Sequence, residues 1–497
     1  MKNNFKIFYV SAEVTPFIKE QGVADTAGAL PKALKDLGHD IRMMMPNYRS
    51  VNERKYILRD VIRLKEMSVQ LGDKTINANG KSAFLPDSKV QIYFLDYKPF
   101  FDRNTIYRDP KTKKEYADNA ERFSFFALGC LETLKLLHWQ PDIIHCNDWA
   151  TALIPFFLRT KYRDDPFFKN TKVLLTVHDL SEQGIFTSDR IDALGLSADQ
   201  HYAGSQIEVN GKFNFLKAGV LCADSISLVG ESFAKEVKKN ADIAFGLGEI
   251  IQKRKRAVTG VDVGIDALAW NPEANSHFEH HFSATSLAGK GKSKAAFLEE
   301  HGLTQNEQLL FIVVMVNTQL INEFDKFEQF LADLLKLEAQ VLVMGELTTK
   351  MQRALGRLAK QSGNRFACEA APDEAFLHRS LAAADLLLQL GSIINLPVNH
   401  FHAMRYGTVP VVSEKSEFSA LINDYNQKVS IANGFLVPEK ASAKQIQKIV
   451  QQAVGLFAQK SKWQKLVKNA MKQDNSWHSI AESHTKIYSH LLGRNKK

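Results

Sequence analysis

Residues 19–25, KEQGVAD, could bind an anion, because they separate an apolar run from a helical pattern. A glycine such as Gly22 lets the backbone approach a phosphate group closely, and the amides that begin a helix can donate to it. The same pattern is also typical of an ordinary loop between a strand and a helix. On its own, this segment therefore leaves both interpretations open.

Two further side chains follow buried strand patterns. His178 comes directly after Val173–Val177, and Asp148 follows Ile143–His145 in the sequence HCNDWA. A lone histidine is usually structural, but one at the carboxyl end of a strand could contact a ligand. Asp148 could bind a hydroxyl group, or it could cap the helix that follows.

The elements that position these residues alternate between strands and helices. Apolar runs of strand length recur throughout the chain, at Phe5–Val10, Ile41–Met45, Ile143–His145, Val173–Val177, Leu309–Val316, Gln340–Met344, Asp385–Leu390 and Val409–Val412. Helical patterns lie between them, so the sequence predicts parallel sheets covered by helices. We expect an α/β fold with two Rossmann-like, doubly wound domains facing across a cleft, where such folds bind ligands.

Length and composition limit the classes of protein to consider. A chain of 497 residues exceeds the usual size of one domain, and we place the break near Gly260–Pro272. The longest apolar run is too short to span a bilayer, and no signal-peptide pattern precedes the first strand, which predicts a cytoplasmic protein. The four cysteines lack metal-type spacing. The net charge of +9 includes the run KRKR at 253–256, but no nucleic-acid motif accompanies it, so we interpret it as a solvated surface.

Several sequence blocks resemble those of the bacterial glycogen synthase and plant starch synthase family, and they occur in the same order and with the same spacing as in that family. They are FKIFYVSAEVTPF, PDIIHCNDWATAL, TKVLLTVHDL, FNFLKAG, VDVGIDALAWNP, AMRYGTVPVV and NSWHSIAESHTKIY. The resemblance implies a GT-B fold with an N-terminal, acceptor-side domain at 1–262, a nucleotide-sugar domain at 263–475, and a closing helix at 476–497 that returns to the first domain.

The resemblance also implies an activity and a set of site residues. Family members transfer glucose from ADP-glucose to the end of an α-1,4-glucan, without a metal or another cofactor. The matching positions give His178, Asp25 and Asp148 as catalytic candidates and Lys19 and Gly22 as donor-binding candidates. The expected partners are an α-glucan or other carbohydrate and an ADP-sugar, with no nucleic acid and no membrane.

Several positions depart from the family pattern. In the first loop, Glu20 and Gln21 replace a threonine and a glycine. After the pair Asp148-Trp149, Ala150 replaces a histidine. The arginine and lysine that neutralise the diphosphate become Asn317 and Asn322, and the acid that holds the sugar becomes Ile394.

These departures predict a donor site that has lost its charges. A glycine pair near the phosphates becomes Ser416 and Glu417, which adds a negative charge. Losing one preorganised donor to a developing anion lowers a rate by about 10²–10³. We therefore expect weak or absent synthase activity. The alternatives are a non-catalytic protein that binds glucan or regulates a synthase, and a glycosyltransferase that uses another donor.

Overall fold

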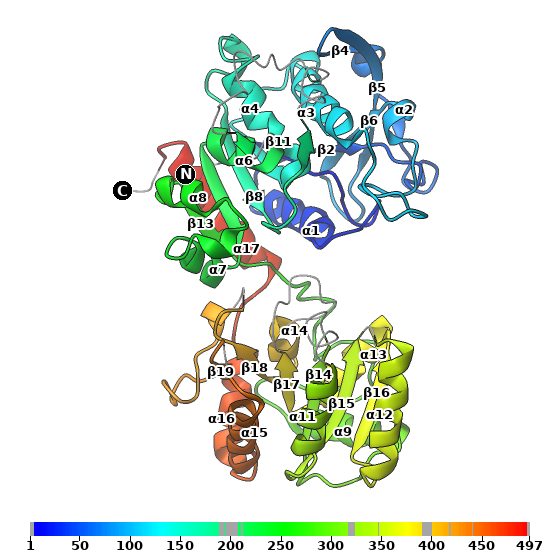
Figure 1. The fold of residues 1–497 in the computed structure, drawn as a ribbon, viewed down its shortest axis with the longest axis vertical. Coiled ribbons are helices and arrows are strands. Elements are labelled where there is room, and N and C mark those ends of the chain that lie inside the picture. The colour runs from blue at the N-terminus through cyan, green and yellow to red at the C-terminus, as the bar shows by residue number, and fades with distance from the viewer. Residues whose placement is uncertain are drawn as a thin grey trace. The chain divides into compact units, whose positions relative to one another are not determined.

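The computed structural model describes residues 4–187, 194, 207–209, 212–316, 324–345, 347–389, 400–416, 419–439 and 441–494. The chain forms two compact units. Unit 1 contains Met1–Gly264 and Trp477–Lys497, and unit 2 contains Ile265–Ser476. Each unit is described by itself below (Figure 1).

The large sheet of unit 1 has a parallel part and an antiparallel extension. Its strands run in the order β13-β12-β8-β7-β1-β2-β6-β5-β3, and β4 pairs with β5. Pairing is parallel from β13 to β6 and antiparallel beyond it. The strands are β1 (Lys6–Val10), β2 (Asp40–Pro46), β3 (Arg59–Asp60), β4 (Met67–Leu71), β5 (Lys74–Phe84), β6 (Gln91–Asp96), β7 (Ile143–Asn147), β8 (Lys172–Val177), β12 (Ser225–Val229) and β13 (Val258–Val261).

The strand order reverses between β1 and β7. Strands β2 and β6 continue on one side of β1, while β7, β8, β12 and β13 continue on the other. In doubly wound sheets, ligands bind at the carboxyl ends of the strands on either side of such a reversal. The loops after β1, β7 and β8 therefore form the edge where a site is expected.

Helices and a small antiparallel sheet complete unit 1. The small sheet contains β9 (Ile185–Thr187), β10 (Glu208–Val209) and β11 (Lys212–Asn214). The helices are α1 (Val23–Asp36), α2 (Lys98–Phe101), α3 (Asn119–Leu136), α4 (Leu153–Arg159), α6 (Phe215–Cys222), α7 (Glu231–Val237), α8 (Gly248–Lys253) and α17 (Trp477–Leu491). Helix α17 returns to this unit from the end of the chain and contacts α1.

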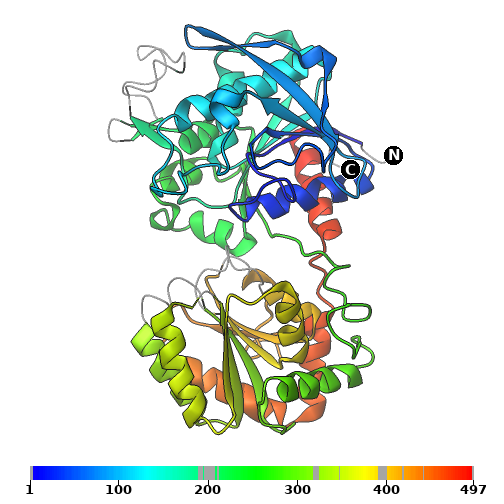
Figure 2. The ribbon, with the colours of Figure 1, turned by 90° about the vertical axis from the view of Figure 1, so that its right-hand side faces the viewer.

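Unit 2 is a parallel sheet between helices. The strand order is β16-β15-β14-β17-β18-β19, and every pair is parallel. In Figure 2 its strands lie between helices on both sides. The strands are β14 (Leu310–Met315), β15 (Ala339–Gly345), β16 (Phe366–Ala370), β17 (Leu386–Gln389), β18 (Val409–Ser413) and β19 (Phe435–Val437). The helices are α9 (Ala288–Glu300), α11 (Phe324–Leu334), α12 (Thr349–Gln361), α13 (Glu374–Ala383), α14 (His400–Arg405), α15 (Ala443–Phe457) and α16 (Lys460–Met471).

Two doubly wound sheets, parallel except at one edge of the sheet in unit 1, confirm the fold class predicted from the alternation of strands and helices. Apolar runs predict these strands because the strands of a parallel sheet are buried on both faces, so that nearly all their residues are apolar. In unit 2 the order reverses between β14 and β17. The segments that follow these strands contain Asn317, Asn322 and Ile394, which lie outside the described residues.

Two buried lysines fix α9 to neighbouring elements of unit 2. Lys294 Nζ lies 2.6 Å from Asp385 Oδ2, and Asp385 also accepts from the Phe311 amide. Lys290 Nζ donates to the carbonyls of Ala382 and Tyr406 and to Thr408 Oγ1. These lysines are therefore committed to structural contacts.

Candidate functional site at the carboxyl edge of unit 1

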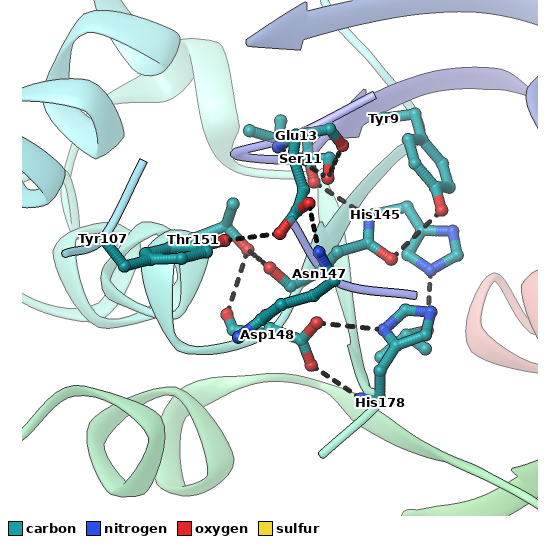
Figure 3. Close-up of polar contacts among 12 residues, drawn as sticks. Tyr9, Ser11, Glu13, Tyr107, His145, Asn147, Asp148, Thr151 and His178 are labelled. Atoms are coloured by element: carbon teal, nitrogen blue, oxygen red, sulfur yellow. Dashed lines mark hydrogen bonds and ion pairs between the residues drawn. The ribbon is translucent and has the colours of Figure 1, made fainter. Parts of the chain in front are cut away.

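The loop after β1 folds around a buried glutamate. Glu13 Oε2 accepts from the backbone amides of Glu20, at 2.6 Å, and Gln21, at 2.8 Å. Its other oxygen accepts from Tyr107 Oη at 3.0 Å (Figure 3). Burial raises the pKa of Glu13 to about 7, although the two backbone hydrogen bonds oppose the rise. Two amides of the candidate anion-binding loop therefore already donate to a carboxylate of the same chain.

The charged side chains of this loop are also paired. Lys19 Nζ lies 2.6 Å from Asp25 Oδ2, and Thr15 donates to Asp25 Oδ1. About half of each charged side chain in the ion pair is exposed to solvent. The Glu20 carboxylate accepts from the Ile106 amide at 2.6 Å. Gly22 precedes α1 with φ −64°, a conformation open to any residue.

Asp148 and His178 form a buried pair at the ends of β7 and β8. Asp148 Oδ1 accepts from the His178 backbone amide at 2.6 Å, and its Oδ2 lies 3.1 Å from His178 Nδ1 (Figure 3). Asp148 makes no side-chain hydrogen bond to the short helix after it. Of the two roles expected for Asp148, helix capping is therefore absent, and the carboxylate instead positions the histidine.

The backbone of Asp148 is strained. Its φ of 56° and ψ of −175° lie in a region that glycine adopts more readily than other residues. Such strain costs on the order of 1–3 kcal/mol and persists where surrounding contacts enforce it. Strained residues gather at functional sites, so this conformation is consistent with a site at the end of β7.

A polar network connects this edge with the last helix. His145, on β7, bonds to Tyr488 on α17 through Nδ1 and to Thr176 on β8 through Nε2, each at 2.7 Å. Tyr9 donates to Asn147 Oδ1, and the Asn147 amide donates to the Val10 carbonyl. Burial holds the pKa of His145 well below its usual value, so its ring is neutral at pH 7.

A small cavity of about 10 Å³ lies within this network, which is about the least space that can hold one water molecule. His145, His178 and His484 line it, together with Tyr9 and Asp262. Burial raises the pKa of Asp262 to about 6. Burial also lowers the pKa of His484 to about 4. The cavity is too small for a sugar ring.

The structure brings the predicted residues together as two pairs, Lys19 with Asp25 and Asp148 with His178. Tyr107 lies between these regions, because it donates to Glu13 and its ring contacts Trp149, the neighbour of Asp148. Sequence reasoning missed Glu13 and Tyr107. A glutamate three residues after a buried strand, in FYVSAEV, was the available signal for Glu13.

Among the residues that the structure describes, no three metal-ligating side chains gather at this edge. In the same part of the chain, no helix is long and apolar enough to cross a bilayer.

Comparison with known proteins identifies the family. A model of the starch synthase catalytic domain matches residues 6–253. The glycogen synthase of Chlorobium phaeobacteroides is 32% identical over 491 residues, covering 99% of each chain. The chain belongs to the glycogen and starch synthase family. The glycogen synthase of Koribacter versatilis, 33% identical over 482 residues and 97% of each chain, is a further relative of this family member.

Solved structures agree on the fold. The catalytic domain of starch synthase IV from Arabidopsis thaliana, bound to ADP and acarbose, matches with a TM-score of 0.82 at 22% identity. The match covers 99% of this chain and 100% of that domain. The sucrose-phosphate synthase of Thermosynechococcus elongatus matches with a TM-score of 0.53 at 14% identity, over 98% of this chain and 99% of that one. This family member therefore has the two-sheet GT-B fold expected from its sequence.

Proposed function

We propose that this member of the glycogen synthase family binds α-glucan and transfers glucose from ADP-glucose to it only weakly. The observation that carries the proposal is the charge of the segment after β14. No lysine or arginine occurs from Val313 to Asp325, and Asn317 and Asn322 stand where the family has two cations. A departing diphosphate gains negative charge that needs fixed donors or cations nearby.

The described strands before this segment support the argument. β14 and β17 are neighbours at the reversal of the sheet, with Val314 beside Leu388. Such sheets bind ligands beyond the carboxyl ends of the strands on either side of a reversal. In the sequence, the residues that follow these two strands include the two asparagines and Ile394, which has no charge with which to hold a sugar.

Unit 1 adds a second line of support. The amides of Glu20 and Gln21 donate to Glu13, so a phosphate would have to compete with a carboxylate for them. In unit 2, after β18, Lys415 Nζ lies 3.2 Å from Glu439, so this cation is also paired. Each feature lowers the positive potential that a phosphate group would meet in its own unit.

The relatives suggest which ligands to test. The relatives named above are glycogen synthases, and the starch synthase IV domain was solved with ADP and acarbose. Calorimetric titration with ADP and ADP-glucose should give affinities weaker than millimolar. Glycogen co-sedimentation should show binding, while incorporation of labelled glucose into glycogen should be near background. Micromolar ADP-glucose binding together with rapid incorporation would contradict the proposal.

Restoring the charges tests the cause. The triple variant Asn317→Arg, Asn322→Lys and Ile394→Glu should gain ADP-glucose affinity and transfer activity. Its matched control replaces the same three residues with glutamine, which changes their size without adding charge. Equal behaviour of the two variants would show that lost charge does not account for the weak activity. Glucan binding without nucleotide binding in both would favour a scaffold or regulator.

A further inference from the structure

A second cluster of chemically capable side chains lies in unit 2, on α13 and the segment that precedes α9. Glu374 and His378 stand one turn apart on α13, so they share one face of that helix. His277 joins them from the segment that precedes α9. One possible ligand atom from each residue lies within 4.8 Å of the other two.

His378 is the fixed member of the cluster. Its side chain is 1% exposed, and its ring stacks on Trp270 at a centroid distance of 3.8 Å. The Nδ1 atom lies 2.6 Å from Tyr406 Oη and 3.2 Å from Asn275 Nδ2, and the Nε2 atom lies 4.0 Å from Glu374 Oε1. One ring nitrogen is thus held by a phenol and a side-chain amide, and the other faces the carboxylate.

The backbone of His277 is also held in place. Asn275, which is buried, accepts from the His277 amide at 2.9 Å and donates to the Ala269 carbonyl at 2.6 Å. The His277 ring lies over His378, with centroids 4.6 Å apart and planes 28° apart. The backbone position is therefore set, and the half-buried ring stacks on His378.

We propose that His277, Glu374 and His378 bind one divalent transition-metal ion, and that Zn²⁺ is the ion that fits them best. Two imidazoles and one carboxylate form a donor set that suits zinc and its neighbours, whereas Mg²⁺ and Ca²⁺ require mainly oxygen ligands. The remaining coordination position would be filled by water.

Binding requires a small closure around His378. Zinc bonds to histidine nitrogen and carboxylate oxygen at about 2.0–2.2 Å, so its ligand atoms stand closer together than they do here. Glu374 is 78% exposed and can change rotamer freely. The His277 ring must rotate away from its stacked orientation. The buried ring of His378 stays in place, and the two mobile ligands move towards it.

The surroundings of His378 fit a ligand role. A metal-bound histidine generally donates its other N–H to an oxygen, which fixes the ring and its tautomer. Tyr406 Oη can accept from Nδ1–H in that state. The ion would connect α13 with the segment that carries His277, and so stabilise unit 2. This is a structural role, separate from the glucosyl transfer that the family resemblance implies needs no metal.

Zinc titration of the full chain tests the proposal. After a chelator has removed any bound metal, calorimetry should show that the tightest site of the wild type binds one Zn²⁺ per chain. His277→Ala and Glu374→Gln should each weaken that affinity at least tenfold, since even second-shell changes cost about 10–100-fold. The matched controls are His280→Ala, on the same segment, and Glu279→Gln, which is also exposed.

Trp270 supplies an independent readout, because its ring stacks on His378. Cu²⁺ should quench part of the tryptophan fluorescence in the wild type and the controls, and less in His277→Ala. Melting temperatures measured without metal should agree among the variants, while added Zn²⁺ should raise the melting temperature of the wild type and controls only. Equal zinc affinity in all five proteins, or no zinc bound, would overturn the proposal.

Discussion

The carboxylate of Asp148 contacts both the main chain and the ring of His178. One oxygen accepts from the backbone amide at 2.6 Å, and the other lies 3.1 Å from Nδ1. These residues are 30 positions apart, and they meet because β7 and β8 are parallel neighbours. The pair fixes the histidine at the carboxyl edge of unit 1, where the family resemblance implies contact with the sugar.

Replacing Asp148 with asparagine should destabilise unit 1. Asparagine keeps the shape and tolerates the positive φ, but it removes the charge that strengthens both contacts. We expect the free energy of unfolding to fall by about 1–3 kcal/mol. The measurement is urea denaturation of both proteins at pH 7. Asp179→Asn is the control, because the Asp179 carboxylate accepts from the amide and the hydroxyl of the nearby Ser181 and is less buried. Equal losses in the two variants would contradict a special role for Asp148.

Glu13 should make stability depend on pH. Burial raises its pKa in the folded state from 4.5 to about 7, so the folded protein binds this proton more tightly than the unfolded chain. Its stabilising contribution is therefore complete below pH 4.5 and is lost as the pH rises towards 7. The full effect is on the order of 3 kcal/mol.

Glu13→Gln should flatten this dependence, because glutamine does not titrate. Melting temperatures of the wild type and the variant, compared at half-unit steps from pH 4.5 to 8, measure the difference. Glu20→Gln is the control, since it changes a carboxylate of the same loop that accepts from a different amide. A wild-type curve parallel to that of Glu13→Gln would show that Glu13 does not titrate in this range.

Lys19 should matter for ligand binding more than for folding. Its ion pair with Asp25 is half exposed, and such pairs contribute about 0–1 kcal/mol. Lys19→Ala should therefore leave the melting temperature nearly unchanged. In the charge-restored triple variant, it should weaken ADP binding measured by calorimetry. Arg49→Ala, which breaks another exposed pair, with Asp102, should change neither property. Unchanged ADP affinity in Lys19→Ala would remove Lys19 from the donor site.

Breaking the buried pair Lys294–Asp385 of unit 2 should lower the free energy of unfolding far more than breaking the exposed pair of Lys19 does. Lys294→Met leaves Asp385 as an unpaired buried carboxylate, which costs about 3–5 kcal/mol. Adding Asp385→Asn should recover part of the loss, because the uncompensated charge disappears while an oxygen remains for the Phe311 amide. Thermal unfolding of the wild type, both single variants and the double variant measures the coupling. Additive losses would show that the two residues do not depend on each other.

The sequence by itself determined the class of fold and the order of its main elements. Buried parallel strands are continuous apolar runs, so the runs at Val173–Val177 and Leu309–Val316 predict β8 and β14 closely. The antiparallel strands β3 to β5 were not predicted, since their half-exposed residues lack such runs. The family blocks also gave the candidate positions, including the three that lie outside the described residues.

Only the tertiary structure decided which residues meet. Glu13 binds Tyr107 across 94 positions, and His145 binds Tyr488 across 343. A local pattern records whether a residue is buried, but not which strand lies beside its own. The order of strands brings distant loops to one edge of a sheet, and hydrogen-bond geometry then selects their partners. That is why the sequence could propose Asp148 as a candidate, but could not predict that its carboxylate contacts His178 and does not cap the following helix.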